Sequence, residues 1–132
     1  MFPPNRKPPG MIIAAPRSGS GKTTVVLGLL RALARSGVGV QPFKCGPDYI
    51  DPAFHEAACG RESFNIDSWA MRRETVMDVL AAADGADFAL AEASMGLFDG
   101  GARAGAWGTG ASADVAALTG WPVVLILDVS GQ

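Results

Sequence analysis

A glycine-rich segment between an apolar run and a helical pattern places the strongest constraint on the fold of this chain. Residues 18–24 have the sequence Ser-Gly-Ser-Gly-Lys-Thr-Thr and follow the apolar residues 11–15. A short apolar run without alternation is typical of a parallel strand covered on both faces. After Lys22, apolar residues recur three and four positions apart, as on one face of a helix: Val26, Leu29, Leu30 and Leu33. This order predicts a loop whose backbone N–H groups surround a phosphate at a helix N-terminus.

The same segment carries the side chains that a bound nucleoside triphosphate requires. The expected nucleotide-binding residues are Ser18, Gly19, Ser20, Gly21, Lys22, Thr23 and Thr24. Lys22 would contact the β- and γ-phosphates of ATP, and the Thr23 hydroxyl would ligate Mg²⁺. The common phosphate-loop pattern has a glycine five residues before Gly21, where this chain has Pro16. The alternative is a glycine-rich turn that binds nothing, and the flanking strand and helix argue against it.

The rest of the pattern predicts an α/β fold with a doubly wound, mainly parallel sheet of about four strands. The first helix is expected to end near Gly37, and residues 45–64 are expected to be irregular with at most a helical turn at 53–58. The other expected elements are strands at 38–44 and 86–92, a buried strand at 123–128, helices at 72–83 and 112–118, the latter capped by Ser112, and a mobile loop at 96–110. Strands that alternate with helices indicate right-handed crossovers and an incomplete P-loop NTPase domain.

Length and composition bound the domain organisation. The 132 residues are 48% hydrophobic, which is enough for one core. Residues 1–10 are expected to be a flexible, proline-rich lead-in, and residues 11–132 the N-terminal part of a P-loop ATP-binding domain. Because the strand expected at 123–128 has only four residues after it, we expect a fragment of a longer protein. A small, complete four-strand domain is the alternative.

Charge and cysteine usage exclude several classes of protein. A net charge of −2 argues against a nucleic-acid binder. No apolar stretch reaches the roughly 18 residues of a membrane-spanning helix. Two cysteines, Cys45 and Cys59, are too few for a disulfide scaffold, so a reduced, cytoplasmic protein is expected.

Polar residues stand at or just after the ends of the predicted strands. They are Lys44, Asp48, Asp51, Glu92, Asp99 and Asp128. Ligands of open α/β sheets bind at the carboxyl ends of the strands, so we expect Lys22, Lys44, Glu92 and Asp128 to face one edge. For the aspartates that lie beside Pro47 and Pro52, a role as ordinary turn formers is an equal alternative.

Histidine, cysteine and tryptophan residues leave their roles open. His55 could be a general base, but a capping or packing role is favoured. His55 with Cys45 and Cys59 would make only three ligands at irregular spacing, which argues against structural zinc. Trp69 and Trp107 belong either to the core or to the lining of a large apolar ligand site.

Three segments together resemble the cobyrinic acid a,c-diamide synthase family, including its hydrogenobyrinic acid members. They are residues 14–24 (AAPRSGSGKTT), 41–52 (QPFKCGPDYIDP) and 95–100 (MGLFDG), the second being the most specific. The similarity covers nearly all of the chain after Met11. It implies a dethiobiotin-synthetase-like ATPase domain, joined in the family to a C-terminal class I glutamine amidotransferase domain. In the family, ATP activates the a and c side-chain carboxylates of a corrinoid, and ammonia from glutamine completes each amide.

The resemblance also implies roles for individual residues. Lys22 would bind phosphate, and Thr23, Asp48 and Glu92 would hold or position Mg²⁺. The residues expected to act in catalysis are Lys44, Asp48, Asp51 and Asp99, with Lys44 near the reacting carboxyl group. Members usually have Glu-Gly-Val where this chain has Glu-Ala-Ser at 92–94, so the Cβ of Ala93 is expected to crowd a backbone approach to the ligand.

The resulting hypothesis is an ATP-dependent carboxylate-amide ligase in cobalamin biosynthesis, of which this chain carries the ATP- and Mg²⁺-binding segment. Its expected partners are the corrinoid and, through a missing domain, glutamine, with no nucleic acid or membrane; a homodimer is left open. One rival is a partition-type ATPase switch, whose deviant loop the segment 17–23 resembles. Arg17 in place of the signature lysine of that loop, and residues 47–51, argue against it. The other rival is an inactive fragment of marginal stability.

Overall fold

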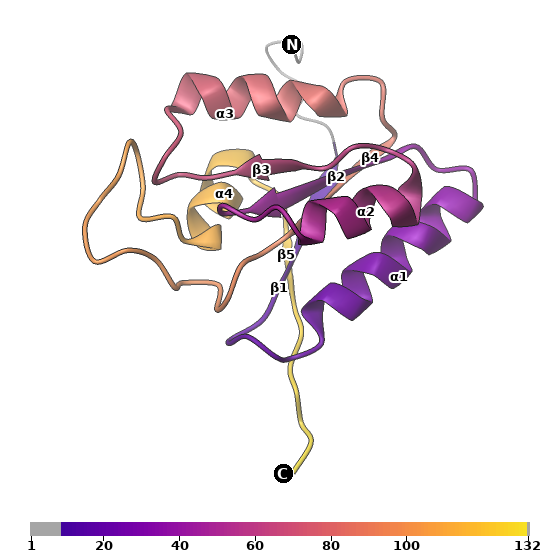
Figure 1. Ribbon diagram of the computed structural model, residues 1–132, viewed down its shortest axis with the longest axis horizontal. Coiled ribbons are helices and arrows are strands. Elements are labelled where there is room, and N and C mark those ends of the chain that lie inside the picture. Colours follow the sequence, from indigo (N-terminus) through magenta and orange to yellow (C-terminus); the bar gives the residue numbers. More distant parts are fainter. Residues whose placement is uncertain (1–8, 132) are drawn as a thin grey trace.

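The computed structural model describes residues 9–131, and in them a parallel β-sheet lies between two layers of helices (Figure 1). The five strands of this region are β1 (Gly10–Ala14), β2 (Val40–Cys45), β3 (Phe64–Ile66), β4 (Phe88–Glu92) and β5 (Val123–Leu125). Their order in the sheet is β3-β2-β4-β1-β5, and every neighbouring pair is parallel. The predicted α/β class and parallel sheet are therefore confirmed.

The helices cover the sheet in pairs. They are α1 (Lys22–Arg35), α2 (Asp51–Cys59), α3 (Arg73–Leu80), which continues into a 3₁₀ turn at Ala81–Ala83, and α4 (Ser112–Thr119). Ile13 of β1 packs with Val26 and Leu30 of α1, whereas Ile12 packs with residues of α3 and α4. Successive residues of a strand point to opposite faces, so α1 and α2 share one face and α3 and α4 share the other.

The first strand and helix form as the sequence predicts. β1 is buried almost throughout, and α1 ends at Arg35, followed by the C-cap residue Ser36 and by Gly37 at φ 81°. The predicted lead-in at 1–10 lies outside the described residues except at its end, where Gly10 already belongs to β1. A Cβ on Gly10 would stand 2.7 Å from the Trp121 ring, so only glycine lets the strand begin against this ring. Among the described residues, no helix combines the length and apolar character needed to cross a bilayer.

The prediction that residues 45–64 are irregular was wrong. α2 is a full helix of nine residues, and β3 adds a fifth strand that begins at Phe64. Pro52 suggested a break, but it stands in the first turn of α2, where its missing N–H has no helical partner to lose. β3 lies at an edge of the sheet. Its three residues are too few to show the apolar pattern of a strand in the sequence.

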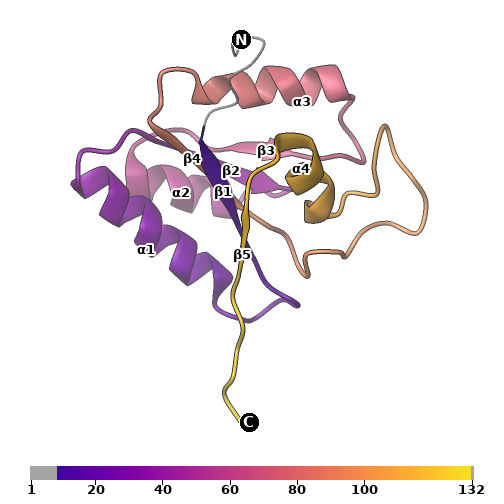
Figure 2. The same cartoon turned by 180° about the vertical axis from the view of Figure 1, so that it is seen from behind.

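The strand predicted at 123–128 does form, but it is shorter and more exposed than predicted. β5 ends at Leu125, and Val124, Leu125 and Leu127 are 43%, 44% and 61% exposed. β5 is the other edge of the sheet, and no helix of the described residues follows it to cover its outer side (Figure 2).

Two details of residues 96–112 correct or extend the prediction. Ser112 does not cap α4: the N-cap residue is Ala111, and the Ser112 hydroxyl instead accepts a hydrogen bond from the Ser94 N–H at 3.0 Å. Residues 96–110 contain no helix or strand, as expected, and the loop contacts Trp69 through the Ala106 N–H. The mobility predicted for this loop stays a prediction.

Candidate functional site

The loop between β1 and α1 has the backbone of a phosphate-binding turn. Gly19 and Gly21 have φ values of 79° and 87°, in the left-handed region that a Cβ disfavours. Gly21 is the N-cap residue of α1, and no side chain caps this helix. The first N–H groups of a helix have no partner within the helix, so this end can receive an anion.

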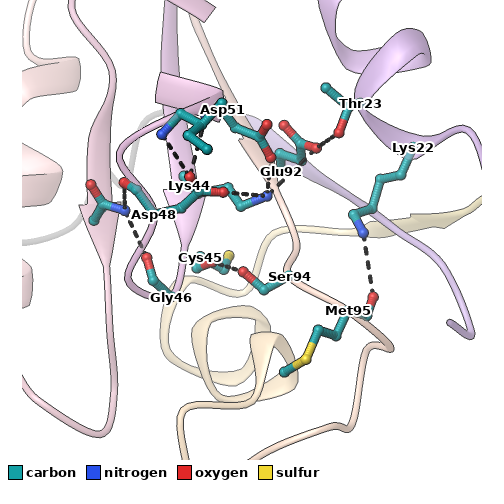
Figure 3. Close-up of polar contacts among 12 residues, drawn as sticks. Lys22, Thr23, Lys44, Cys45, Gly46, Asp48, Asp51, Glu92, Ser94 and Met95 are labelled. Carbon is teal, nitrogen blue, oxygen red and sulfur yellow. Dashed lines mark hydrogen bonds and ion pairs between the residues drawn. The ribbon is translucent and has the colours of Figure 1, made fainter. Parts of the chain in front are cut away.

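Lys22 lies between the loop and the segment that follows β4. Its side chain is largely buried, and its Nζ donates to the Met95 carbonyl oxygen at 3.3 Å (Figure 3). Burial and the nearby charge of Lys44 lower the pKa of Lys22 below 10.5. A pocket of about 370 Å³ opens here, lined by Ser18, Gly19, Gly21, Lys22, Thr23, Thr24, Lys44, Asp51 and Met95. Of the predicted nucleotide-binding residues, only Ser20 is not in this lining.

A buried cluster of charges continues the site along the strand ends. Lys44 and Glu92 are neighbours in the register of β2 and β4, so both point toward α1 and α2. The Lys44 Nζ lies 2.5 Å from Asp51 Oδ2, 3.5 Å from Asp48 Oδ2 and 3.6 Å from Glu92 Oε1 (Figure 3). Burial disfavours the charge of Lys44, but its hydrogen bond to Asp51 and the charge of Glu92 prevail and raise its pKa.

Glu92 is fully buried and hydrogen-bonded at both oxygens. The Thr23 hydroxyl donates to Oε1, and His55 Nε2 lies 2.5 Å from Oε2. Burial raises the pKa of Glu92, but the hydrogen bonds from His55 and Thr23 and the charge of Lys44 outweigh burial and lower it. Glu92 is therefore an ionised carboxylate at neutral pH.

Asp48 forms an ordinary turn and also pairs with the charged cluster. Its Oδ1 accepts from the N–H groups of Ile50 and Asp51, as in an ordinary turn, while its Oδ2 faces Lys44. Burial opposes its ionisation, but these two N–H groups and Lys44 lower its pKa. Asn65 of β3 donates to the carbonyl oxygens of Gly46 and Asp48, at 2.7 Å each, and so holds the turn against the sheet.

Two predicted acidic residues lie outside this cluster. Asp99 Oδ2 accepts from the Gly96 N–H at 2.9 Å, within its own loop. Asp128 stands three residues beyond β5, where it pairs with Arg17 at 3.9 Å and accepts from Ser130. The expectation that Asp128 ends a strand is corrected, because β5 ends at Leu125. Its ion pair with Arg17, in the loop after β1, keeps it on the carboxyl side of the sheet but outside the Lys44–Glu92 cluster.

The expected crowding at Ala93 is also corrected. Strand alternation turns Ala93 away from the face that carries Glu92, and its methyl group packs in the core beneath α3 and α4. The Cys45 thiol is buried, which raises its pKa to about 12 and leaves it unreactive. Trp107 packs against the core with Arg73 5.9 Å from its ring centre, whereas Trp69 is 53% exposed.

His55, whose role the sequence left open, lies beside the charged cluster in the structure. It is fully buried, and besides Glu92 it contacts the Ser63 hydroxyl through Nδ1 at 2.8 Å. The available signal was its spacing from Asp51: four residues apart on a helix, the two side chains lie on one face. This signal was hidden because residues 51–59 were not predicted to form a helix.

Comparison with known proteins finds a family model and several relatives that match the sequence of this chain. Residues 11–106 match the family model described as "CobQ/CobB/MinD/ParA nucleotide binding domain". Three relatives are named hydrogenobyrinate a,c-diamide synthase. The chain is 62% identical over 125 residues to that of Rhodobacter capsulatus, 57% over 120 to that of Rhizobium meliloti and 56% over 124 to that of Mesorhizobium japonicum.

These alignments cover 95%, 90% and 92% of this chain but 29%, 27% and 28% of the respective relatives. The chain thus spans less than a third of the length of the curated relatives it matches. The resemblance to the a,c-diamide synthases that the three sequence segments indicated is confirmed.

Proposed function

Because this chain belongs to the CobQ/CobB/MinD/ParA nucleotide-binding domain family, we propose that it binds ATP and Mg²⁺ at the pocket beside Lys22. We further propose that it is the N-terminal synthetase segment of an enzyme that amidates the a and c carboxylates of a corrinoid acid. The chemistry is that of an ATP-dependent carboxylate-amide ligase in cobalamin biosynthesis, working in the cytoplasm with glutamine as amide donor.

The observation that carries the proposal is the convergence of two separate parts of the sequence on one pocket. The glycine-rich loop supplies Lys22 and Thr23, and the strand-end cluster supplies Lys44 and Asp51 to the same lining. A site that only bound phosphate would need the loop alone. A second lysine and carboxylates beside it are what a group-transfer site needs to position an acceptor and offset charge.

The donor set of the site fits Mg²⁺ bound together with a nucleotide. Among residues 9–131, no group of three or more His, Cys, Asp or Glu side chains is arranged to hold a metal alone. Mg²⁺ usually binds through one or two carboxylates and takes its other ligands from water and substrate phosphates. The Thr23 hydroxyl and the carboxylates of Asp48 and Glu92 are the proposed ligands or positioning groups, and bound Mg²⁺ would offset phosphate charge.

The residues of the chain account for the steps that amidation requires. A carboxylate resists attack by ammonia because oxide is a poor leaving group, and transfer of the γ-phosphoryl group from ATP makes that leaving group phosphate. Lys22 would bind the phosphates, and Lys44 would lie between ATP and the acid. Asp51 orients the Lys44 ammonium at 2.5 Å. Asp99, on the loop after β4, is proposed to contact metal or substrate.

The names of the relatives support hydrogenobyrinic or cobyrinic acid as the substrate class. Glutamine would be hydrolysed by a part of the protein that this chain does not contain, since the chain matches less than a third of each relative. A homodimer is compatible with this proposal.

Substitution of Lys22 tests the nucleotide site. We expect Lys22→Ala to weaken ATP binding on the order of 100-fold or more, as for loss of one partner of a buried charge pair. Isothermal titration calorimetry with ATP and Mg²⁺ measures this. Arg31→Ala, which removes an exposed cation on the same helix, is the matched control and should leave the affinity unchanged. Equal affinities for the two variants would refute the site.

The family model also covers the partition-type ATPases MinD and ParA, so an ATP-driven dimerisation switch is the rival function. In this chain Arg17 is exposed and pairs with Asp128, and it does not line the pocket. Light scattering tests for a switch, which would dimerise on addition of ATP without any acid. An assay of ADP tests for the ligase, which would form ADP only when the corrinoid acid is also present.

A further inference from the structure

His55 is a buried polar residue to which the proposed mechanism assigns no task. It is the only histidine of the chain, it is fully buried on α2, and both of its ring nitrogens have partners. Nε2 meets Glu92 Oε2 at 2.5 Å, and Nδ1 meets the Ser63 hydroxyl at 2.8 Å. A histidine that only filled space would not need a hydrogen-bond partner at each end.

The chemistry of Glu92 determines the direction of its bond to His55. An ionised carboxylate only accepts, so Nε2 carries the hydrogen and donates it to Glu92. A serine hydroxyl can donate or accept a hydrogen bond, so Ser63 can pair with Nδ1 in either direction. Ser63 thus holds the His55 ring in the orientation that points Nε2 at Glu92.

The remaining oxygen of Glu92 faces the proposed nucleotide site. Oε1 accepts from the Thr23 hydroxyl and lies 3.6 Å from the Lys44 Nζ. A hydroxyl that donates its hydrogen to a carboxylate keeps its lone pairs available for a cation. Rotation of the Glu92 carboxylate would break this arrangement, and the bond from His55 to Oε2 opposes that rotation.

The helix α2 couples this bond to the rest of the cluster. Asp51 and His55 lie one turn apart on α2, and they contact Lys44 and Glu92, which are neighbours on β2 and β4. α2 therefore fixes both members of the Lys44–Glu92 pair from one side, while Thr23 of α1 contacts Glu92 from the other.

We propose that His55 is a positioning residue, which holds the Glu92 carboxylate so that Oε1 orients Thr23 for the Mg²⁺-bound nucleotide. This inference rests on the proposed nucleotide function, and it assigns His55 no contact with substrate. Hydrogen-bond partners of metal-site residues typically change metal affinity by about 10- to 100-fold when they are removed. The effect should therefore appear in the Mg²⁺ dependence of ATP binding.

The test compares the affinity of the chain for ATP in Mg²⁺ with its affinity in EDTA, by isothermal titration calorimetry. We expect His55→Leu to reduce the Mg²⁺-dependent gain in affinity about tenfold or more, with the affinity in EDTA unchanged. His55→Gln, which can still present an N–H to Glu92, should keep the gain within about threefold of the wild type. Val76→Ala, a core truncation on α3 in the opposite layer, controls for loss of stability and should keep the gain.

A wild-type gain in His55→Leu would overturn the proposal, as would an equal loss in His55→Gln. If His55→Leu does not fold, Ser63→Ala takes its place, since it removes the hydroxyl that holds Nδ1 but leaves the ring. Ser63→Ala should lose part of the gain, and an undiminished gain would overturn the proposal. No Mg²⁺-dependent ATP binding by the wild type would refute the nucleotide function itself, which separates the two failures.

Discussion

Two regions of the sheet, one in its interior and one at its edge, reverse the usual distribution of side chains. At the carboxyl ends of β2 and β4, in the interior of the sheet, Lys44 and Glu92 are buried with His55. At and after β5, at the edge, Leu127 and Val129 are 61% and 72% exposed. One region buries charge, and the other exposes apolar surface.

The buried charges and the exposed apolar side chains each indicate a different kind of function. Burying an ion pair costs desolvation free energy that its attraction barely offsets, so fold stability alone does not explain such a cluster. A site for a charged ligand does explain it. Exposed apolar side chains along an unpaired strand edge are a surface suited to further contact with protein. The carboxyl ends of β2 and β4 are therefore suited to bind a charged ligand, and the edge at β5 is suited to contact with protein.

The largest expected effect comes from breaking the buried cluster at its only lysine. Lys44→Ala leaves Glu92 buried without its cation, so we expect the free energy of unfolding to fall by about 3–5 kcal/mol. Urea denaturation followed by circular dichroism measures it. Arg31→Ala, on the exposed side of α1, should change it by less than about 0.5 kcal/mol.

The neutral double variant Lys44→Met with Glu92→Gln sharpens the result. Replacing both members of a buried pair by uncharged side chains is often close to neutral in stability. The double variant should therefore recover most of what Lys44→Ala loses, although it loses Mg²⁺-dependent ATP binding. If Lys44→Ala is no less stable than Arg31→Ala, the cluster does not act as a buried charge pair.

The charged region was predictable in part because its signals are local. The loop at 18–24 and the positions of Lys44 and Glu92 depend only on short segments and on the rule that parallel strands end at one edge. The contact between His55 and Glu92 joins residues 37 apart. It depends on α2 being a helix, and Pro52 concealed that helix.

The edge was not predictable, because an apolar strand has the same pattern whether or not a helix covers it. Residues 123–128 are as apolar as residues 11–15, yet only β1 lies between two neighbouring strands and under helices on both faces. Burial depends on what packs against a strand, and the residues of the strand itself do not contain that information. The same reason explains why Asp128 was predicted to end a strand, although β5 ends at Leu125.

Acid should weaken the charged region and spare the edge. The pKa values of Glu92 and Asp48 are lowered in the folded chain from 4.5 and 3.8. A lowered folded pKa gives stability that is present above the unfolded value and is lost as pH falls toward the folded value. We therefore expect a free energy of unfolding that is constant from about pH 6 to 8 and falls below about pH 4.5, by about 1.4 kcal/mol per pH unit for each proton taken up.

Urea denaturation at a series of pH values measures this slope. Glu92→Gln removes one of the two groups and should make the slope shallower. Glu74→Gln, on the exposed surface of α3, is the matched control and should keep the wild-type slope. A wild-type slope in Glu92→Gln would mean that the buried carboxylate takes up no proton over this range.

The smallest expected change in stability concerns the edge. Leu127→Lys places a charge on the exposed apolar surface beyond β5, so the free energy of unfolding should change by no more than about 0.5 kcal/mol. Association of the chain should change far more, because a lysine on an edge opposes contact between copies. Sedimentation velocity over a range of concentrations should show wild-type association that Leu127→Lys abolishes. Thr75→Lys, which adds the same charge to the exposed face of α3, should associate like the wild type.

A wild type that stays monomeric at every concentration would show that the exposed apolar side chains at this edge do not drive association. The contrast between the edge and the charged interior would then rest on the burial of their side chains alone.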